Sequence, residues 1–332
     1  MYPIAIQGSD IIAQVIASLC KRSGFTDISM TLDRPIWPPA LTLGAHQTRI
    51  LQSLGLGDSI RRDGHVPDRE QVRLARSEYL VSEFPLGKFY EDRYGAPLVN
   101  ITHDSLHSLV VNPWPTTNAS PPVLNIETRG ETFDKNEWHL QHSYQAGEPS
   151  NANVTWLGRD AVGWQSSTVD GSHFYVLTNN PGDLSLADWS PRLHAFVENL
   201  KTVNQFATQP DLRTHWQDGD WVFLGKASLS QQPINPVTWL TGLEDAWVLS
   251  RMMENYEQDI EQGTRAYAQY RQPRAKRILT QCNNLSKSYF ATTTTRRVTR
   301  NLGIALRSRF LPEIAMQRID WLHGFDCIKG FN

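Results

Sequence analysis

Histidines are the side chains best suited to metal binding or proton transfer in this sequence of 332 residues. His103 and His107 stand four positions apart, a spacing that puts both rings on one face of a helix and suits a metal ion. The sequence shows no third ligand for them, so we interpret the pair as structural and predict no metal site. His139 and His142 follow Trp138 and are expected at a strand edge or in a loop.

No nucleophile stands in a catalytic setting. Ser9, Ser166 and Ser167 lack the G-x-S-x-G turn that exposes a catalytic serine. The cysteines are far apart, fit neither a metal site nor a disulfide framework, and are predicted to be buried reduced thiols: Cys20, Cys282 and Cys327.

The elements that would position such residues begin with a strand, a turn and a helix. Pro3 to Ile6 is a short apolar run, Gly8 permits a sharp turn, and apolar residues recur at helical spacing from Ile11 to Leu19. Alternation from Ile28 to Leu32 adds a second strand. A strand, helix and strand within about 30 residues form a βαβ unit, in which the two strands pair in parallel.

The remaining pattern changes from strands to helices along the chain. Residues 69–86 alternate like two strands, and residues 112–121 are rich in Pro, Thr and Ser and are expected to form a loop. Further strands are expected within 122–157, 173–180 and 219–225. Helices are expected over 41–60, 190–206, 243–263, a segment bent near Pro273, and 296–310.

Composition excludes several classes of protein. The formal net charge is −2 and there is no basic block, which argues against nucleic-acid binding. No apolar run reaches the roughly 20 residues of a membrane span, and the N-terminal segment lacks a signal-peptide pattern. These features predict a cytoplasmic protein. Hydrophobic residues make up 40% of the chain, an ordinary value for a globular protein.

Five strings occur in a fixed order along the chain. They are LTLGAHQTRILQSLGLGDSIRRDG from Leu41, FPLGKFYEDRYGAPLVNITHDSLHSLV from Phe84, WVFLGKASLSQQPINPVTWLTGLEDAWVLSRMMENY from Trp221, YRQPRAKRILTQCNNLSKSYF from Tyr270, and RIDWLHGFD from Arg318. Together they resemble the FAD-dependent aromatic hydroxylases of the p-hydroxybenzoate and salicylate hydroxylase type.

This resemblance implies an α/β fold with a Rossmann-like, FAD-binding-type domain, a reduced inserted substrate β-sheet and C-terminal helices. The implied division assigns 1–65, 98–165 and 219–290 to the Rossmann-like domain, 66–97 and 166–218 to the substrate sheet, and 291–332 to the C-terminal helices. The substrate sheet is expected to be short, because only 66 positions (226 − 160) separate Asp160 from Lys226.

The resemblance also implies a G-x-G-x-x-G motif after the first strand, where glycines let the backbone approach the FAD diphosphate. Gly8 matches the first glycine and Ser9 follows it, but Asp10 replaces the second glycine and would add a negative charge beside the diphosphate. Asp33 lies near the acidic position expected to receive the adenosine ribose, and Leu32 fits that register equally well.

Two further family motifs are altered. The Asp-Gly motif keeps Asp160 and loses its glycine, while Gly225 is followed by Lys226 where the family has an aspartate for the ribityl chain. His103 stands at the position of a family arginine. The glycine-rich region that approaches the flavin ring is replaced by residues 236–238, a Pro-Val-Thr sequence.

These replacements predict a flavin-free relative with no cofactor, acting as a non-catalytic partner or a small-molecule binding protein. Its expected partners are a second copy of the chain, an active flavoprotein monooxygenase, or a small aromatic ligand. One alternative is an FAD-dependent monooxygenase that uses NADH or NADPH to hydroxylate an aromatic or quinone-like compound. A further alternative is a non-redox enzyme that uses Asp10 and His103 as an acid–base pair in the vacated pocket.

Overall fold

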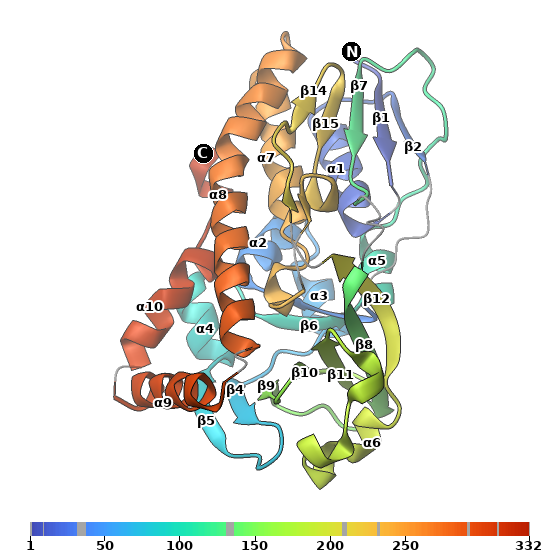
Figure 1. Cartoon of the computed structure of the whole chain (residues 1–332). Coiled ribbons are helices and arrows are strands. Elements are labelled where there is room, and N and C mark those ends of the chain that lie inside the picture. The colour runs from blue at the N-terminus through green and yellow to red at the C-terminus, as the bar shows by residue number, and fades with distance from the viewer. Residues whose placement is uncertain are drawn as a thin grey trace.

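Two large sheets joined by helices make up the chain, as a computed structural model shows (Figure 1). The structure describes residues 2–8, 10–31, 38–130, 136–207, 211–230, 233–290, 293–310 and 312–331. One sheet lies at each end of the molecule, and the long helix α8 runs beside both (Figure 1).

The first sheet has the strand order β14-β15-β7-β1-β2. Its strands are β1 (Ile4–Gln7), β2 (Ile28–Thr31), β7 (Leu124–Glu127), β14 (Gln217–Asp218) and β15 (Trp221–Phe223). β1 pairs in parallel with both β2 and β7, and β15 pairs in parallel with β7. The predicted βαβ unit is therefore confirmed, with α1 (Ile11–Arg22) connecting β1 to β2.

The second sheet has seven strands in the order β12-β8-β11-β10-β9-β4-β5. Their bounds are β4 (Arg69–Leu74), β5 (Leu80–Pro85), β8 (Asn136–Ala146), β9 (Ala152–Leu157), β10 (Ala161–Thr168), β11 (Gly171–Thr178) and β12 (Lys201–Ala207). One face packs Trp156, Phe174 and Val176 under the turns that follow β11. The opposite face carries Trp164 and Tyr175 into the main core.

Two short antiparallel pairs complete the strands. β3 (Ala40–Leu43) pairs with β6 (Val99–Thr102), and β13 (Asp211–Leu212) pairs with β16 (Leu229–Ser230). The β3–β6 pair lies between the two large sheets, and the Tyr175 hydroxyl bonds both the amide and the carbonyl of Ala40.

The remaining helices connect and cover the sheets. They are α2 (Ala45–Ser53), α3 (Gly57–Asp63), α4 (Gly87–Tyr94), α5 (His103–Val110), α6 (His194–Val197), α7 (Gly242–Asn255), α8 (Ile260–Tyr289), α9 (Thr294–Phe310) and α10 (Pro312–His323). The short 3-10 turns are η1 (Pro181–Asp183), η2 (Leu186–Asp188), η3 (Pro191–Leu193), η4 (Gly225–Ala227), η5 (Pro236–Thr238) and η6 (Lys329–Phe331).

Three expected helices differ from the structure. Residues 41–60 begin as strand β3, because their apolar start pairs with β6 before α2 opens at Ala45. Residues 190–206 contain the one-turn α6 and then β12, which gains its hydrogen bonds from β8. The helix expected over 243–263 ends at Asn255, and Gly263 lies inside α8, which also continues through Pro273.

The fold class implied by the resemblance is confirmed, since a parallel sheet, an antiparallel sheet and C-terminal helices are all present. The implied division into domains stays a prediction. Residues 136–165, which that division assigns to the Rossmann-like domain, form β8, β9 and most of β10 of the seven-stranded sheet. Within the described ranges, no helix has the length and apolar character needed to cross a membrane.

Candidate functional site

The carboxyl ends of β1 and β7 mark the point where the chain order of the parallel sheet reverses, because β2 lies on one side of β1 and β7 on the other. Ligands of doubly wound folds bind at such switch points. Gly8 follows β1 with φ of 123°, and a Cβ there would lie 2.3 Å from the Thr128 hydroxyl beyond β7. Only glycine fits at position 8, as the first position of the family motif requires.

Asp10 occupies the N-terminus of α1. Its carboxylate accepts a hydrogen bond from the Ala13 amide at 2.8 Å, and the Thr128 hydroxyl lies 3.4 Å away. Burial raises the pKa of Asp10, while the Ala13 amide and the Lys226 ammonium oppose that rise. The aspartate therefore caps α1 with a carboxyl group that takes up a proton more readily than an exposed one.

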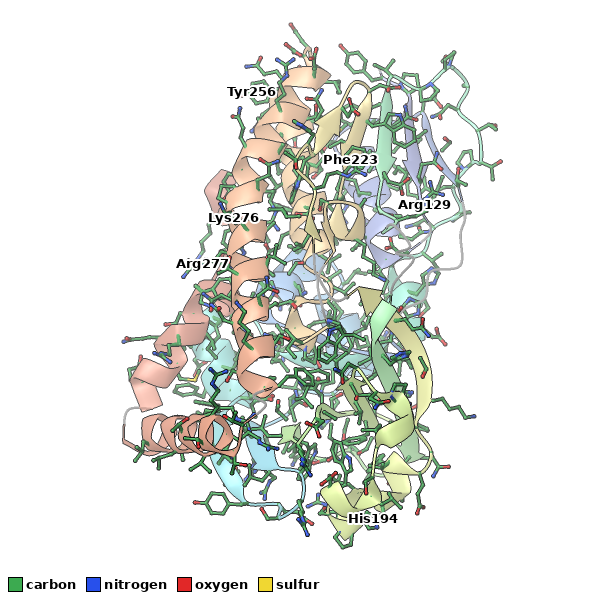
Figure 2. All side chains as sticks on the ribbon, in the orientation of Figure 1. Arg129, His194, Phe223, Tyr256, Lys276 and Arg277 are labelled. Atoms are coloured by element: carbon green, nitrogen blue, oxygen red, sulfur yellow. The ribbon has the colours of Figure 1, made fainter. Side chains whose placement is uncertain are left out.

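Two cations stand at the same end of the sheet. Lys226 belongs to η4, and burial lowers its pKa while Asp10 opposes the change. Arg129 follows β7 and binds Glu127 with two charged hydrogen bonds of 2.8 and 2.7 Å. Its Cγ would lie 3.6 Å from a Cβ on Gly8, so Arg129 borders the same turn, and Figure 2 shows it on the parallel-sheet half of the molecule.

Gly225 brings η4 against the N-terminal parts of α1 and α7. A Cβ on Gly242 would lie 2.8 Å from the Gly225 Cα and 2.4 Å from Ile12. The Gly225 amide, at φ of 56°, donates to the Asp245 carboxylate at 2.9 Å. Gly225 and Gly242 are thus in contact, and Lys226 lies beside α1.

A buried charge cluster lies behind this turn. Arg271 binds Glu244 and Asp245, each at 2.7 Å, and Arg274 binds Glu244 at 2.9 Å. Burial alone would raise the pKa of Glu244, but Arg274 and Arg271 hold it at about 2. Arg274 also donates to the carbonyls of Trp321 and Leu322, so the cluster joins α7, α8 and α10.

His46 is the buried side chain whose polar atoms are least satisfied. Neither ring nitrogen has a hydrogen-bond partner in the described part of the chain, and Glu244 is 3.8 Å away. Burial holds the pKa of His46 well below its ordinary value, so the ring is neutral. Its ring lies against Gly44, which also contacts Val237 of η5. This is the segment that the resemblance places against the flavin ring.

The other sequence-predicted residues are dispersed. Ser9 and Asp33 lie outside the described residues. Asp160 lies in the β9–β10 turn with 81% of its side chain exposed, 3.7 Å from Arg159. His103 approaches Asp104 at 3.2 Å.

No hydrogen bond between Asp10 and His103, the expected acid–base pair, is found among the described residues. His103 stacks on His107 with ring centroids 5.8 Å apart, whereas Asp10 bonds within the α1 turn. Among the described residues, no cluster of three metal-binding side chains includes either histidine.

Sequence reasoning missed Arg129 and the pair His142–His173. Arg129 becomes relevant only when β7 pairs with β1, a contact between residues more than 110 positions apart. His142 Nε2 lies 3.0 Å from His173 Nδ1 across β8 and β11, although His142 was expected merely at a strand edge. The register of β8 against β11 could not be read from residue spacing.

The site fits the diphosphate end of FAD. Gly8 gives the backbone its close approach, α1 presents its N-terminus, and Lys226 and Arg129 supply positive charge. At the ring end, the buried nitrogens of His46 have no hydrogen-bond partner among the described residues. However, Val237 touches the β3–α2 turn and Gln47 binds its carbonyl at 3.1 Å, so a ring inserted there would displace η5.

Comparisons with known proteins agree with this architecture. No model of a protein family matches the sequence. The 6-hydroxynicotinate 3-monooxygenase of Bordetella bronchiseptica is 20% identical, over 83% of this chain and 89% of that protein. A variant of HpxO from Klebsiella pneumoniae, in complex with FAD, has a TM-score of 0.80 at 16% identity, covering 97% of this chain and 98% of that one. A salicylate hydroxylase substrate complex gives 0.73 at 13% identity, covering 98% and 96%.

These comparisons correct the expectation that the protein uses no cofactor. That expectation is wrong: the structures that share this fold include complexes with FAD. They likewise give no support to a pseudoenzyme, since the relatives are flavoprotein monooxygenases. The resemblance to aromatic hydroxylases is confirmed at the level of the fold: this chain has the fold of the FAD-dependent aromatic hydroxylases.

Proposed function

We propose that the protein is an FAD-dependent monooxygenase that hydroxylates a small aromatic or quinone-like molecule at the expense of NADH or NADPH. The observation that carries this proposal is the turn at Gly8, where steric exclusion of any side chain, a helix N-terminus and two cations meet at the switch point of the parallel sheet. FAD, when bound, supplies the redox chemistry of hydroxylation.

Each residue of this turn would have a separate role in binding a diphosphate. Gly8 keeps the backbone open, and the first amides of α1 point toward the anion. Lys226 would give up part of its attraction to Asp10 in favour of the phosphate oxygens. Asp10 would then carry a proton, because burial has already raised its pKa and a neighbouring anion would raise it further.

Substitution of Gly8 tests the proposal. Gly8→Ala places a methyl group 2.3 Å from the Thr128 hydroxyl and is expected to abolish retention of FAD after desalting. Gly24→Ala is the matched control, since Gly24 also has positive φ, of 93°, but meets no atom within 4 Å. Both variants strain the backbone, so the difference in their FAD retention measures the effect of the side chain inside the turn at Gly8.

The proposal would be overturned by a folded wild-type protein that takes up no FAD at high concentration. It would also be overturned by FAD retention that is unchanged in Gly8→Ala. Substrate-dependent oxidation of NADH or NADPH by the flavin-loaded protein is the activity expected to follow.

A further inference from the structure

The face of the seven-stranded sheet that turns toward β3 carries a chain of hydrogen-bonded side chains at its outer end. Cross-strand pairing puts His142 opposite Tyr175, and Tyr144 opposite His173, on β8 and β11. Thr168 ends β10, and Asp170 lies in the turn that follows.

The chain starts at a carboxylate that can only accept hydrogen bonds. The Thr168 hydroxyl donates to Asp170 Oδ1 at 2.5 Å. His173 Nε2 lies 3.1 Å from the same hydroxyl oxygen, and His173 Nδ1 lies 3.0 Å from His142 Nε2. Three consecutive bonds thus connect Asp170 to His142.

The direction of the first bond fixes both histidine tautomers. Thr168 has one hydroxyl proton and gives it to Asp170, so His173 Nε2 must carry the proton that Thr168 accepts. His173 Nδ1 is then a bare acceptor, and His142 Nε2 must carry the proton donated to it. It follows that His142 Nδ1 holds an unshared lone pair.

That lone pair is available. No described residue hydrogen-bonds to His142 Nδ1, and the His142 side chain is half-buried. Burial and the neighbouring ring of His173 lower the pKa of His142 to about 4, and burial lowers that of His173 to about 4. Both rings are therefore neutral near pH 7, and His142 acts there as a hydrogen-bond acceptor.

The groups around His142 favour a flat aromatic ligand. The Tyr175 ring lies 4.7 Å from the His142 ring and contacts Trp239, next to η5, edge-on at 5.5 Å. The Tyr144 ring lies 4.9 Å from the His173 ring, and a cation, Lys201 of β12, is the cross-strand partner of His142. Aromatic rings beside one acceptor and one lysine suit a ring that bears an acidic proton.

We propose that His142 Nδ1 is the hydrogen-bond acceptor that selects aromatic ligands carrying a ring hydroxyl or a lactam N–H. This inference rests on the proposed function for placing the substrate at this sheet face. The chain Asp170–Thr168–His173 acts through His142 by holding it in the Nε2–H tautomer. Asp170, Thr168 and His173 are thus positioning residues, and His142 is the residue that touches the ligand.

The tautomer can be measured on the wild-type protein. Long-range ¹H–¹⁵N correlation spectra of protein labelled in histidine, at pH 7.5, are expected to show both rings neutral with the proton on Nε2. Thr168→Val removes the hydroxyl and should release that preference, whereas Thr168→Ser should retain it. A proton on His142 Nδ1 in the wild type would overturn the proposal.

Ligand selection is measured by calorimetry with 6-hydroxynicotinate and nicotinate, which differ by one ring hydroxyl. The wild type is expected to bind 6-hydroxynicotinate about tenfold more tightly, and His142→Phe to lose that preference while keeping its affinity for nicotinate. Equal affinities in the wild type, or an equal loss for both compounds in His142→Phe, would overturn the proposal. The FAD content of each sample is determined separately, so failure of flavin binding remains distinguishable from failure at His142.

Discussion

Two groups of buried charge lie close together in the core and differ in their surroundings. Glu244, Asp245, Arg271 and Arg274 bond one another at 2.7–2.9 Å and join α7 to α8. Asp10 and Lys226 attract each other at the end of the parallel sheet. Burial raises the pKa of Asp10 and lowers the pKa of Lys226, so it favours the uncharged form of both. The first group is complete, in the sense that two guanidinium groups pair with two carboxylates, whereas the second is a single opposed pair whose charged forms burial disfavours.

The difference follows the family pattern. The Glu-Asp-Ala string and the Arg-Gln-Pro-Arg string both match the hydroxylases and supply the complete group. Asp10 and Lys226 are two positions where the chain departs from the family. Asp10 replaces a glycine and adds a negative charge, and Lys226 replaces an aspartate with a positive charge. The framework is thus maintained while the charge distribution at the diphosphate site is changed.

The largest effect is expected in the complete group. Arg271→Met leaves Glu244 and Asp245 with one cation fewer, and should reduce the free energy of unfolding by about 3–5 kcal/mol in urea titrations. The control is Arg265→Met, which breaks an exposed pair with Glu261, both side chains being more than 60% exposed. That variant should change stability by less than about 1 kcal/mol. An equal loss of unfolding free energy in the two variants would show that the buried ion pairs stabilise the fold no more than the exposed pair does.

A smaller effect is expected at the second group. Asp10→Asn keeps a capping oxygen for Ala13 and removes the cost of protonating a carboxylate when the diphosphate binds, so FAD should bind about tenfold more tightly. Lys226→Met should weaken FAD binding by a similar factor. Asp58→Asn, in the first turn of α3, is a control that should leave the affinity unchanged. Titration of flavin fluorescence measures all four proteins, and weaker binding by Asp10→Asn would contradict the assignment.

Glu70 is a further buried carboxyl group, and no ion pair with it is found among the described residues. Burial raises its pKa to about 7, against an ordinary value of 4.5. Its folded pKa lies above its unfolded pKa, so ionisation destabilises the fold above pH 7 and this penalty disappears as the pH falls to 4.5.

Glu70→Gln should therefore be more stable than the wild type at pH 8, by about 1 kcal/mol given the partial exposure of the side chain. The two proteins should converge near pH 4.5. Urea midpoints at both pH values provide the measurement, and a difference independent of pH would refute the raised pKa.

Local patterns predicted the elements that form without distant partners. The βαβ unit at Ile4–Thr31 and the hairpin β4–β5 both follow from apolar spacing. β3 and β12 were mistaken for helix because their status depends on pairing with β6 and β8, far away in the sequence. For β12 the polar side chains at Lys201 and Gln205 are exposed, so the strand lacks the alternation that identifies a buried one.

The candidate site was predicted only in part, for the same reason. Gly8, Asp10 and Lys226 could be named from the motif positions, but their convergence depends on η4 returning to the start of α1. Arg129 and the His142–His173 pair carry no local signal, since each depends on the register of strands.

Whether the protein binds FAD can be measured by the visible absorption spectrum of the purified protein, before and after incubation with excess FAD and desalting. We expect a flavin band retained at one FAD per chain, and its loss in Gly8→Ala. A colourless, folded protein that retains no FAD would contradict the assignment as a flavoprotein monooxygenase, and would show that Asp10 and Lys226 satisfy each other without a cofactor.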